Sequence, residues 1–282
     1  NVKLHSQDDL NLLANNGNLY GGGFGDKAWA VNTNVEMYGG TIRHSLYGGG
    51  EIASVGFATM KVDEGVIKEV DWTKPVTEGS TKVTMYGGTV ERDVFGGGRG
   101  FSYTLAGALE VENIYYSSGF VFGKTEVNIH RGTVGTDETL KDEAGNVFGG
   151  GKGVNTEIWG STTINLKRGY VFQIFGGSEQ GGIGNGEYNE LTGKIDYTYD
   201  PRYSTYINLT GPIAGVSKHD NISEDIAECE FIYGGGFLGP VAGNCILNLG
   251  NGRIFNSFAG SCNADILGHT ETYIGTNGFP YI

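Results

Sequence analysis

One internal segment, residues 187–203, gathers the side chains best suited to contact a ligand. It sets two carboxylates and a guanidinium among tyrosines: Asp196, Tyr197, Tyr199, Asp200, Arg202 and Tyr203. Aromatic faces stack on sugar rings and charged groups bind hydroxyls, so the segment predicts a ligand contact. Paired carboxylates also serve glycosidases, which keeps catalysis open as an alternative. The pattern Asp-x-x-x-Asp-Pro is equally ordinary turn chemistry, so a plain polar hairpin is the third interpretation.

A second segment, residues 101–122, is rich in aromatic residues and contains Tyr103, Tyr115 and Tyr116. Both segments follow a glycine-rich corner of the repeat described below. We therefore expect them to emerge on one face and to share a binding surface for sugar or protein. The alternative is that the rings pack the two segments down onto the solenoid and leave nothing exposed.

Other motifs give weaker signals. The sequence FGKT at 122–125 is one residue short of the spacing of a phosphate-binding loop from Gly119. The sequence GGGFGD at 21–26 resembles a calcium-binding nonapeptide, but Asp26 comes one residue early and the motif occurs once. We therefore expect no cofactor, with surface calcium as the alternative.

The histidines, cysteines and serines lack the spacings of known active centres. The five histidines show no H-x-x-x-H pair, and the three cysteines form no C-x-x-C motif, so no zinc site or disulfide framework is expected. A G-x-S-x-G elbow is also missing from the sequence. No catalytic residue and no metal ligand is assigned.

A repeat determines where these segments emerge. Residues 33–50 (TNVEMYGGTIRHSLYGGG) and 81–98 (TKVTMYGGTVERDVFGGG) align without a gap, and weaker copies run to residue 278. The shortest steps between the closing aromatic residues give a period of about 25–27 residues. That period suits one coil of a β-solenoid with two or three short strands.

Alternate positions of each copy carry Thr and then two aliphatic residues, as in Thr33, Val35 and Met37. This alternation predicts a strand with one buried face. The glycines that follow predict corners, where a side chain would collide with the next coil or where a positive φ is needed. We expect one column of residues to stack in neighbouring strands: Thr33, Thr81, Thr125, Thr162, Thr205, Cys245 and Thr270.

The expected fold is all-β, a single β-solenoid in the form of a right-handed parallel β-helix of about seven coils. Residues 1–18 are expected to form an N-terminal flank or cap and residues 19–282 the solenoid. Residues 60–78 alternate as in a hairpin, and residues 4–14 and 219–228 suit short helices. Insertions are expected near 51–79, 99–123, 135–145, 179–203 and 215–230.

The composition narrows the function classes. Glycine supplies 51 of the 282 residues and proline only 5, without a Gly-X-Y period, which excludes collagen. The formal net charge of −13 argues against nucleic acid and against an anionic membrane surface as partners. No apolar run is long enough for a transmembrane helix. The chain begins at Asn1, so we expect that any signal peptide has been removed.

The motifs MYGGTIRHSLYGGG and MYGGTVERDVFGGG resemble the glycine-rich β-solenoid repeats of adhesin-like surface proteins of commensal Gram-negative anaerobic bacteria. The resemblance covers residues 19–278. It implies export to the cell surface and a passive role in attachment or assembly. The motif consists of scaffold positions, so the resemblance assigns no catalytic residue.

We therefore expect a non-enzymatic, extracellular or cell-surface solenoid that binds glycan or protein partners. One alternative is a polysaccharide lyase or glycosidase on the same fold, because the fold does not determine the activity. Another is a structural spacer or a subunit of a larger surface assembly. Because Ile282 follows directly on the last expected strand, a continuation or a partner chain is expected to cap that end.

Overall fold

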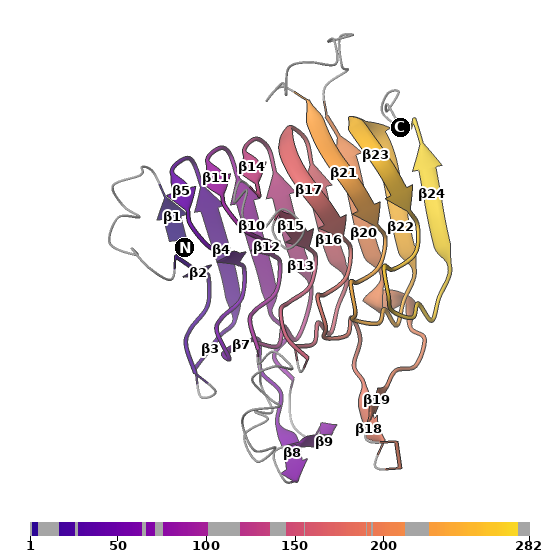
Figure 1. Cartoon of the computed structure of the whole chain (residues 1–282). Helices are drawn as coiled ribbons and strands as arrows, with labels where there is room; N and C mark the ends of the chain where they lie inside the picture. Colours follow the sequence, from indigo (N-terminus) through magenta and orange to yellow (C-terminus); the bar gives the residue numbers. More distant parts are fainter. Residues whose placement is uncertain are drawn as a thin grey trace.

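Eight parallel strands from successive repeats form the first sheet, as Figure 1 shows for this computed structural model. The predicted column is confirmed, because Thr33, Thr81, Thr125, Thr162, Thr205, Cys245 and Thr270 pair in register from strand to strand. In order, the strands are β1 (Val2–Leu4), β4 (Asn32–Met37), β10 (Ser80–Met85), β13 (Thr125–Ile129), β16 (Thr162–Leu166), β20 (Thr205–Thr210), β22 (Cys245–Asn251) and β24 (Thr270–Ile274).

Strand β1 adds a level that the repeat pattern did not include. Its backbone pairs with β4 so that Val2 and Leu4 fall in the columns of Val35 and Met37. The expected N-terminal flank thus contributes a strand to the sheet edge. Three alternating residues are too few to be recognised as a copy of the repeat.

The second sheet is also parallel and carries an aromatic ladder. Its rings stack with centroids 4.8–5.0 Å apart along Tyr20, Tyr47, Phe95, Phe148, Phe175, Tyr233 and Phe258. Its strands are β2 (Leu19–Tyr20), β5 (Thr41–Ile42), β6 (Leu46–Tyr47), β11 (Thr89–Val90), β12 (Val94–Phe95), β14 (Thr133–Val134), β15 (Asn146–Phe148), β17 (Gly169–Phe175), β21 (Ala227–Tyr233) and β23 (Arg253–Phe258).

A third line of parallel backbone contacts is formed by residues that follow a strand of the second sheet and precede the next strand of the first sheet in the sequence. Besides the pair β3 (Trp29–Ala30) and β7 (Ser54–Val55), it consists of single bridges along Val55, Val121, Ile158, Ile183, Val241 and Ile266. Three of the six bridge residues, Val55, Val121 and Ile183, lie in stretches that the sequence analysis assigned to insertions, so these three insertions are shorter than expected. In the sequence, each of these bridge positions is marked by an aliphatic residue that is followed within two positions by glycine.

Inward side chains from the three lines form the core. Residues of the second inward column, Val35, Val83, Val127, Ile164, Ile207 and Leu247, are all fully buried. All three cysteines are free: Cys229 and Cys245 are buried, and Cys262 is exposed. The two buried cysteines act as small apolar side chains.

The two reasons for glycine apply at different corners. Gly88 has a φ of +94°, in the left-handed region that favours glycine, and it closes the bend after the first-sheet strand. The triple glycines have no such φ. At Gly96, a Cβ would instead overlap the carbonyl oxygen of Gly149 in the next repeat. Close approach between repeats therefore explains the triple glycines.

The structure describes residues 2–4, 17–25, 28–63, 66–70, 76–100, 119–135, 145–154, 156–189, 191–192, 194–211 and 226–275. These residues contain strands and one 3-10 helix, η4 (Pro201–Tyr203), but no α-helix. The predicted hairpin within 60–78 is confirmed, as β8 (Met60–Asp63) pairs antiparallel with β9 (Val66–Val70). The helices expected at 4–14 and 219–228 lie mostly outside the described residues, and their described ends are strand.

A side-chain hydrogen bond ties the first sheet to the glycine corner in five repeats. The threonine hydroxyl donates at 2.5–2.6 Å to the carbonyl of the first corner glycine, for example from Thr125 to Gly149. No backbone N–H of the described residues donates to that carbonyl. The threonine column thus satisfies a buried acceptor that would otherwise lack a partner.

The first prediction concerns this bond. Replacing Thr125 by Val keeps the shape and removes the donor, so we expect the free energy of unfolding to fall by about 1–3 kcal/mol. Thr163→Val, on the opposite face of β16, is the control and should change it by less than about 0.5 kcal/mol. Denaturant unfolding measures both. Equal losses in the two variants would contradict the role of the hydroxyl.

Candidate functional site

Segment 187–203 forms an antiparallel hairpin and then η4, which leads into β20. Strand β18 (Glu187–Asn189) pairs with β19 (Lys194–Asp196). The Asn189 amide donates to the Asp196 carboxylate at 2.7 Å, and its oxygen accepts from the backbone N–H of Leu191 at 3.0 Å. The carboxylate of Asp196 is therefore engaged by the hairpin itself.

Tyr197 turns inward at the base of the hairpin. Its hydroxyl donates to Oε1 of Glu157 at 2.8 Å, and Nε1 of Trp159 donates to Oε2 at 2.8 Å. The ring lies over the alternating glycines Gly182, Gly184 and Gly186, where an added methyl group would crowd it. Tyr197 thus anchors the hairpin to the repeat beneath it.

Glu157 is a buried carboxylate with uncharged hydrogen-bond donors. Desolvation raises its pKa from 4.5 to about 7, while the hydrogen bonds from Trp159 and Tyr197 act in the opposite direction. Burial, followed by the charge of Glu157, raises the pKa of Tyr197 well above its usual value, so this hydroxyl stays protonated. The sequence analysis did not select Glu157; its signal was a carboxylate inside the apolar run TEIWG.

Asp200 and Arg202 form a self-contained pair at η4. Oδ2 of Asp200 accepts from Nε of Arg202 at 2.8 Å and from Nη2 at 2.6 Å, and Oδ1 accepts the backbone N–H of Arg202. These hydrogen bonds lower the pKa of Asp200. The guanidinium also lies 5.5 Å from the ring centroid of Tyr203, which packs against the third line of contacts.

The structure divides the predicted ligand-contact residues. Tyr197 and Tyr203 pack inward, in agreement with the alternative that rings hold the segment down. Tyr199 is 46 % exposed, and Asp196, Asp200 and Arg202 lie at the surface in the contacts just described. The remaining three predicted residues lie outside the described residues: Tyr103, Tyr115 and Tyr116. The shared face therefore stays a prediction.

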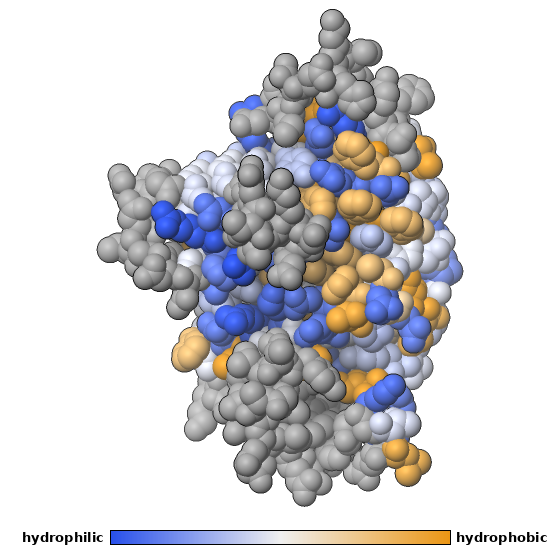
Figure 2. All heavy atoms as spheres, in the orientation of Figure 1, coloured by the Kyte–Doolittle hydropathy of each residue, from blue (hydrophilic) through white to orange (hydrophobic). Residues whose placement is uncertain are grey.

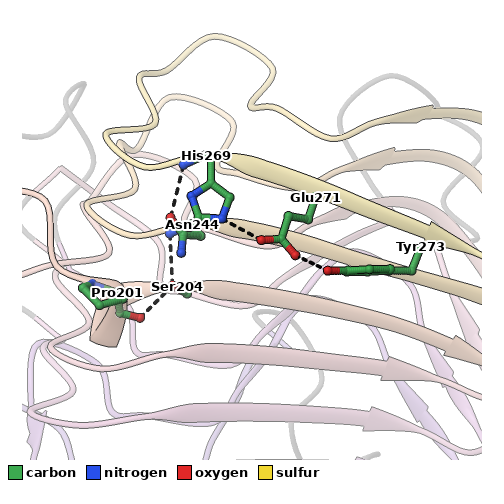
Figure 3. A network of polar contacts seen from close by, with 6 residues as sticks. All are labelled: Pro201, Ser204, Asn244, His269, Glu271 and Tyr273. Atoms are coloured by element: carbon green, nitrogen blue, oxygen red, sulfur yellow. Dashed lines mark hydrogen bonds and ion pairs between the residues drawn. The ribbon is translucent and has the colours of Figure 1, made fainter.

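Polar contacts continue from η4 across neighbouring repeats, as Figure 3 shows. The Ser204 hydroxyl donates to the carbonyl of Pro201 at 2.7 Å and accepts the N–H of Asn244 at 3.0 Å. The side-chain oxygen of Asn244 accepts the N–H of His269 at 3.1 Å. These bonds fix the turns that precede β20, β22 and β24.

On β24 the carboxylate of Glu271 lies between two partners (Figure 3). Nε2 of His269 is 2.6 Å from Oε1, and the Tyr273 hydroxyl donates to Oε2. The bond from Tyr273, followed by that from His269, lowers the pKa of Glu271. The side chains of His269 and Glu271 are exposed, and both carboxylate oxygens of Glu271 have partners.

The face of the first sheet opposite the core, here called the outer face, carries two ordered rows of side chains. In the amide row, each Asn side-chain N–H donates to the oxygen of the preceding Asn at 2.7–2.8 Å. In the ring row, the centroids of Tyr38 and Tyr86 are 4.9 Å apart and those of Tyr86 and His130 are 5.1 Å apart. The amide row consists of Asn128, Asn165, Asn208 and Asn248.

The ring row is uncharged near neutral pH. Burial, and then the charges of Lys167 and Lys82, lower the pKa of His130, so its imidazole is neutral. The sequence carried a signal for the amide row, because asparagine recurs between the inward positions of four repeats. The predicted columns comprised the inward positions, so the amide row was not among the predictions.

Comparison of the chain with protein-family models, curated proteins and solved structures found no match. In the part of the chain that the structure describes, no helix has the length and apolarity to cross a membrane. Across the same residues, no three His, Cys, Asp or Glu side chains gather as a metal site requires. The geometry of the hairpin base and of the outer face must therefore carry the functional argument.

The second prediction tests the anchor. Tyr197→Ala should lower the free energy of unfolding by roughly 2–3 kcal/mol, because it removes a packed ring and the hydroxyl that donates to Oε1 of Glu157, while Trp159 still donates to Oε2. Tyr199→Ala is the matched control on an exposed ring and should stay within about 0.5 kcal/mol of the wild type. Thermal and denaturant unfolding measure both, and equal stability of the two variants would show that Tyr197 is no anchor.

The third prediction concerns pH. The pKa of Glu157 is raised in the folded state, so the folded protein holds this proton more tightly and its stability falls as pH rises from about 4.5 to about 7. Glu157→Gln cannot ionise and keeps an acceptor for Trp159. We expect it to remove about 3 kcal/mol of that fall.

Burial also raises the pKa of Asp93, to about 6. The share of the stability loss that is due to Asp93 should therefore remain in Glu157→Gln. Melting temperatures between pH 4 and pH 8 check this, since these values bracket the titration of both groups. Parallel curves for the wild type and Glu157→Gln across the whole range would contradict the assignment.

Proposed function

We propose that this chain is a β-solenoid, a right-handed parallel β-helix, that binds glycan or protein partners at the cell surface and catalyses no reaction. Among these partners we favour a neutral glycan bound on the outer face. The parallel in-register sheets support the solenoid, and the resemblance of the glycine-rich repeats supports the location.

The observation that carries the binding proposal is the pair of ordered rows on the outer face. An amide has two N–H donors and two acceptor lone pairs, and the row uses one of each at Asn165 and Asn208. The remaining capacity recurs at the spacing of the strands along Asn165, Asn208 and Asn248, whereas Asn128 is buried and donates to Glu126 at 2.7 Å. Such an array suits a polymer that presents hydroxyl groups at regular intervals, and it is ordered before binding, which lowers the entropic cost.

Charge favours a neutral ligand over an acidic one. The ring row is uncharged, and Lys82, one of the two lysines whose charges act on His130, is paired with Glu126 at 3.4 Å. The net charge of the chain is −13, so an acidic polysaccharide meets long-range repulsion. Tyr38 and Tyr86, each 44 % exposed, add amphipathic contact area.

No described carboxylate cluster favours the lyase or glycosidase alternative. Asp196 and Asp200 are bonded within their own segment, and Glu157 faces protein groups. Glycosidases need two carboxylates that flank an accessible substrate. A pure spacer is the remaining alternative, and it differs from our proposal in predicting no ligand for the outer face.

The fourth prediction is a binding experiment. The purified chain is applied to an array of neutral and acidic polysaccharides, and hits are quantified by calorimetry. We expect binding to neutral glycans, and a loss of at least about ten-fold in affinity for Tyr86→Ala at an unchanged melting temperature. This variant removes the central ring of the ring row.

Tyr199→Ala, on the hairpin, is the control and should bind like the wild type. A loss in Tyr199→Ala without one in Tyr86→Ala would move the site to the hairpin and contradict the outer face. An array without any hit would favour the spacer. Release of reducing ends or unsaturated sugars would overturn the non-enzymatic proposal.

A further inference from the structure

The turns that lead from the first sheet into the second form one rim of the stack, and basic residues gather in two of them. In Figure 1 these turns follow one another along the same edge, after β4, β10, β13 and β16. Residues 38–40 and 86–88 read Tyr-Gly-Gly, whereas residues 130–132 read His-Arg-Gly and residues 167–169 read Lys-Arg-Gly. The turns after β4 and β10 thus carry no charge, and the next two carry basic side chains.

Four residues of the turns after β13 and β16 are here called the basic rim: His130, Arg131, Lys167 and Arg168. The strands pair in one register before the turns, from β13 to β16, and after them, from β14 to β17. His130 therefore lies beside Lys167 and Arg131 beside Arg168, at the strand spacing of about 4.8 Å. Like charges at facing positions of neighbouring strands are destabilising, so the stacking of the repeats gives no reason for this arrangement.

Lys167 and Arg168 are exposed and lack a described counter-ion. No ion pair in the part of the chain that the structure describes involves either side chain. Arg131 is exposed as well and makes a further contact, and His130 is half-buried. Lys167 and Arg168 are therefore the two cations whose charge is available to a ligand.

The surroundings of His130 show that the basic rim is locally positive. After burial, which acts most strongly, two charges lower the pKa of this imidazole, first that of Lys167 and then that of Lys82, and both are positive. Lys82 is paired with Glu126 at 3.4 Å, whereas Lys167 is paired with no described carboxylate. A positive patch thus interrupts the surface of a chain whose net charge is −13.

Carboxylates on the other side of the basic rim have partners of their own. On β21, Glu228 pairs with Arg253 at 3.2 Å, and Glu230 accepts the hydroxyl of Tyr170 at 2.9 Å. Further along, apolar residues gather over the last repeats, as Figure 2 shows. The described residues on this side therefore provide no anion for the basic rim.

We infer that the basic rim is a binding site for the oxyanion of a phosphate or sulfate group, held chiefly by Lys167 and Arg168. The planar guanidinium of Arg168 offers a fork of N–H donors that matches two oxygens of one group, and the ammonium of Lys167 adds a point charge. Arg131, one strand spacing away, adds a second guanidinium to the same surface. A dianion gains more from such adjacent cations than a carboxylate, which carries one charge.

This site is separate from the amide row, and its ligand is not the neutral glycan proposed above. The net charge of −13 repels a long acidic polymer, but at physiological ionic strength salt screens charges beyond about 8 Å. A single anionic group therefore responds mainly to the cations that it contacts. Such a group belongs either to a free ion or to a substituent on a sugar, and the choice of probe separates the two sources.

The fifth prediction is that the wild-type chain binds inorganic phosphate with a Kd of about 5 mM or lower. Calorimetry measures the affinity at constant ionic strength, with chloride as the balancing anion. In parallel, NMR follows the imidazole signal of His130, which is identified by its loss in His130→Gln. Phosphate should raise the pKa of His130, because a nearby anion favours the protonated imidazole.

Lys167→Gln and Arg168→Gln each remove one charge and should weaken phosphate binding at least about three-fold, and the double variant at least about ten-fold. Lys124→Gln removes an exposed lysine at the opposite end of β13, and as the matched control it should bind phosphate like the wild type. All three side chains are exposed, so the melting temperature should not change. Arg168→Gln should also retain the affinity of the wild type for a neutral glycan, so the two proposals fail independently.

Inorganic phosphate and inorganic sulfate are compared with a hexose phosphate and with acetate. Equal affinity for inorganic phosphate and the hexose phosphate supports a free ion as the ligand of the basic rim. Higher affinity for the hexose phosphate supports a substituent on a sugar. In either case acetate should bind more weakly, because it carries one charge.

A wild type that binds no phosphate at about 50 mM would overturn the inference and show that other parts of the chain neutralise the basic rim. Acetate binding as tight as that of phosphate would overturn the assignment to phosphate or sulfate. A loss in Lys124→Gln equal to that in Arg168→Gln would overturn the inference in favour of a response to overall charge. An unchanged His130 signal would overturn it by placing the bound ion elsewhere.

Discussion

The structure depends on the short distance between neighbouring repeats, which parallel strand pairing sets at about 4.8 Å. At the glycine corner this distance leaves no room for a Cβ, since one at Gly96 would overlap the carbonyl of Gly149. The same corner holds a carbonyl that faces the interior and needs a donor. Thr81 and Thr125 supply it from the first sheet, so glycine and threonine are required together in each repeat. Where Cys245 replaces threonine, the corner glycine is replaced as well, by Ala259.

The same constraint orders the outside of the molecule. Residues at equivalent positions lie one strand spacing apart, so rings stack and amides bond along the rows without help from other elements. Asn165 bonds to Asn128 in this way, and the ring of Tyr86 lies between Tyr38 and His130. In a sheet without a repeated sequence, each side chain of such a row would have to be specified independently at its own position. Here they follow from repetition, which explains how a scaffold can also carry an ordered polar surface.

The β18–β19 insertion is held in place by side-chain contacts, and not by the stacking that orders the repeats. Among the described strands, the β18–β19 hairpin pairs with none of the two large sheets, and Tyr197 fixes it by reaching a buried carboxylate over three glycines. Burying Glu157 costs stability because no counter-charge among the described residues acts on it, and its raised pKa expresses that cost. The bond fixes the orientation of the hairpin in return. A packed apolar side chain would hold the segment with less directional control.

The repeat was sufficient to establish the all-β class and the parallel columns, because equivalent positions must stack in a repeated fold. The hairpin within 60–78 followed from the alternation of its own residues. The repeat also contained the amide row, as an asparagine at a constant station. It did not decide the side on which Tyr197 and Tyr199 lie, because an insertion has no repeat partner to set its direction. Only the tertiary structure turned Tyr197 towards Glu157 and left Tyr199 at the surface, since that choice depends on the space above Gly182, Gly184 and Gly186, which separate parts of the chain create together.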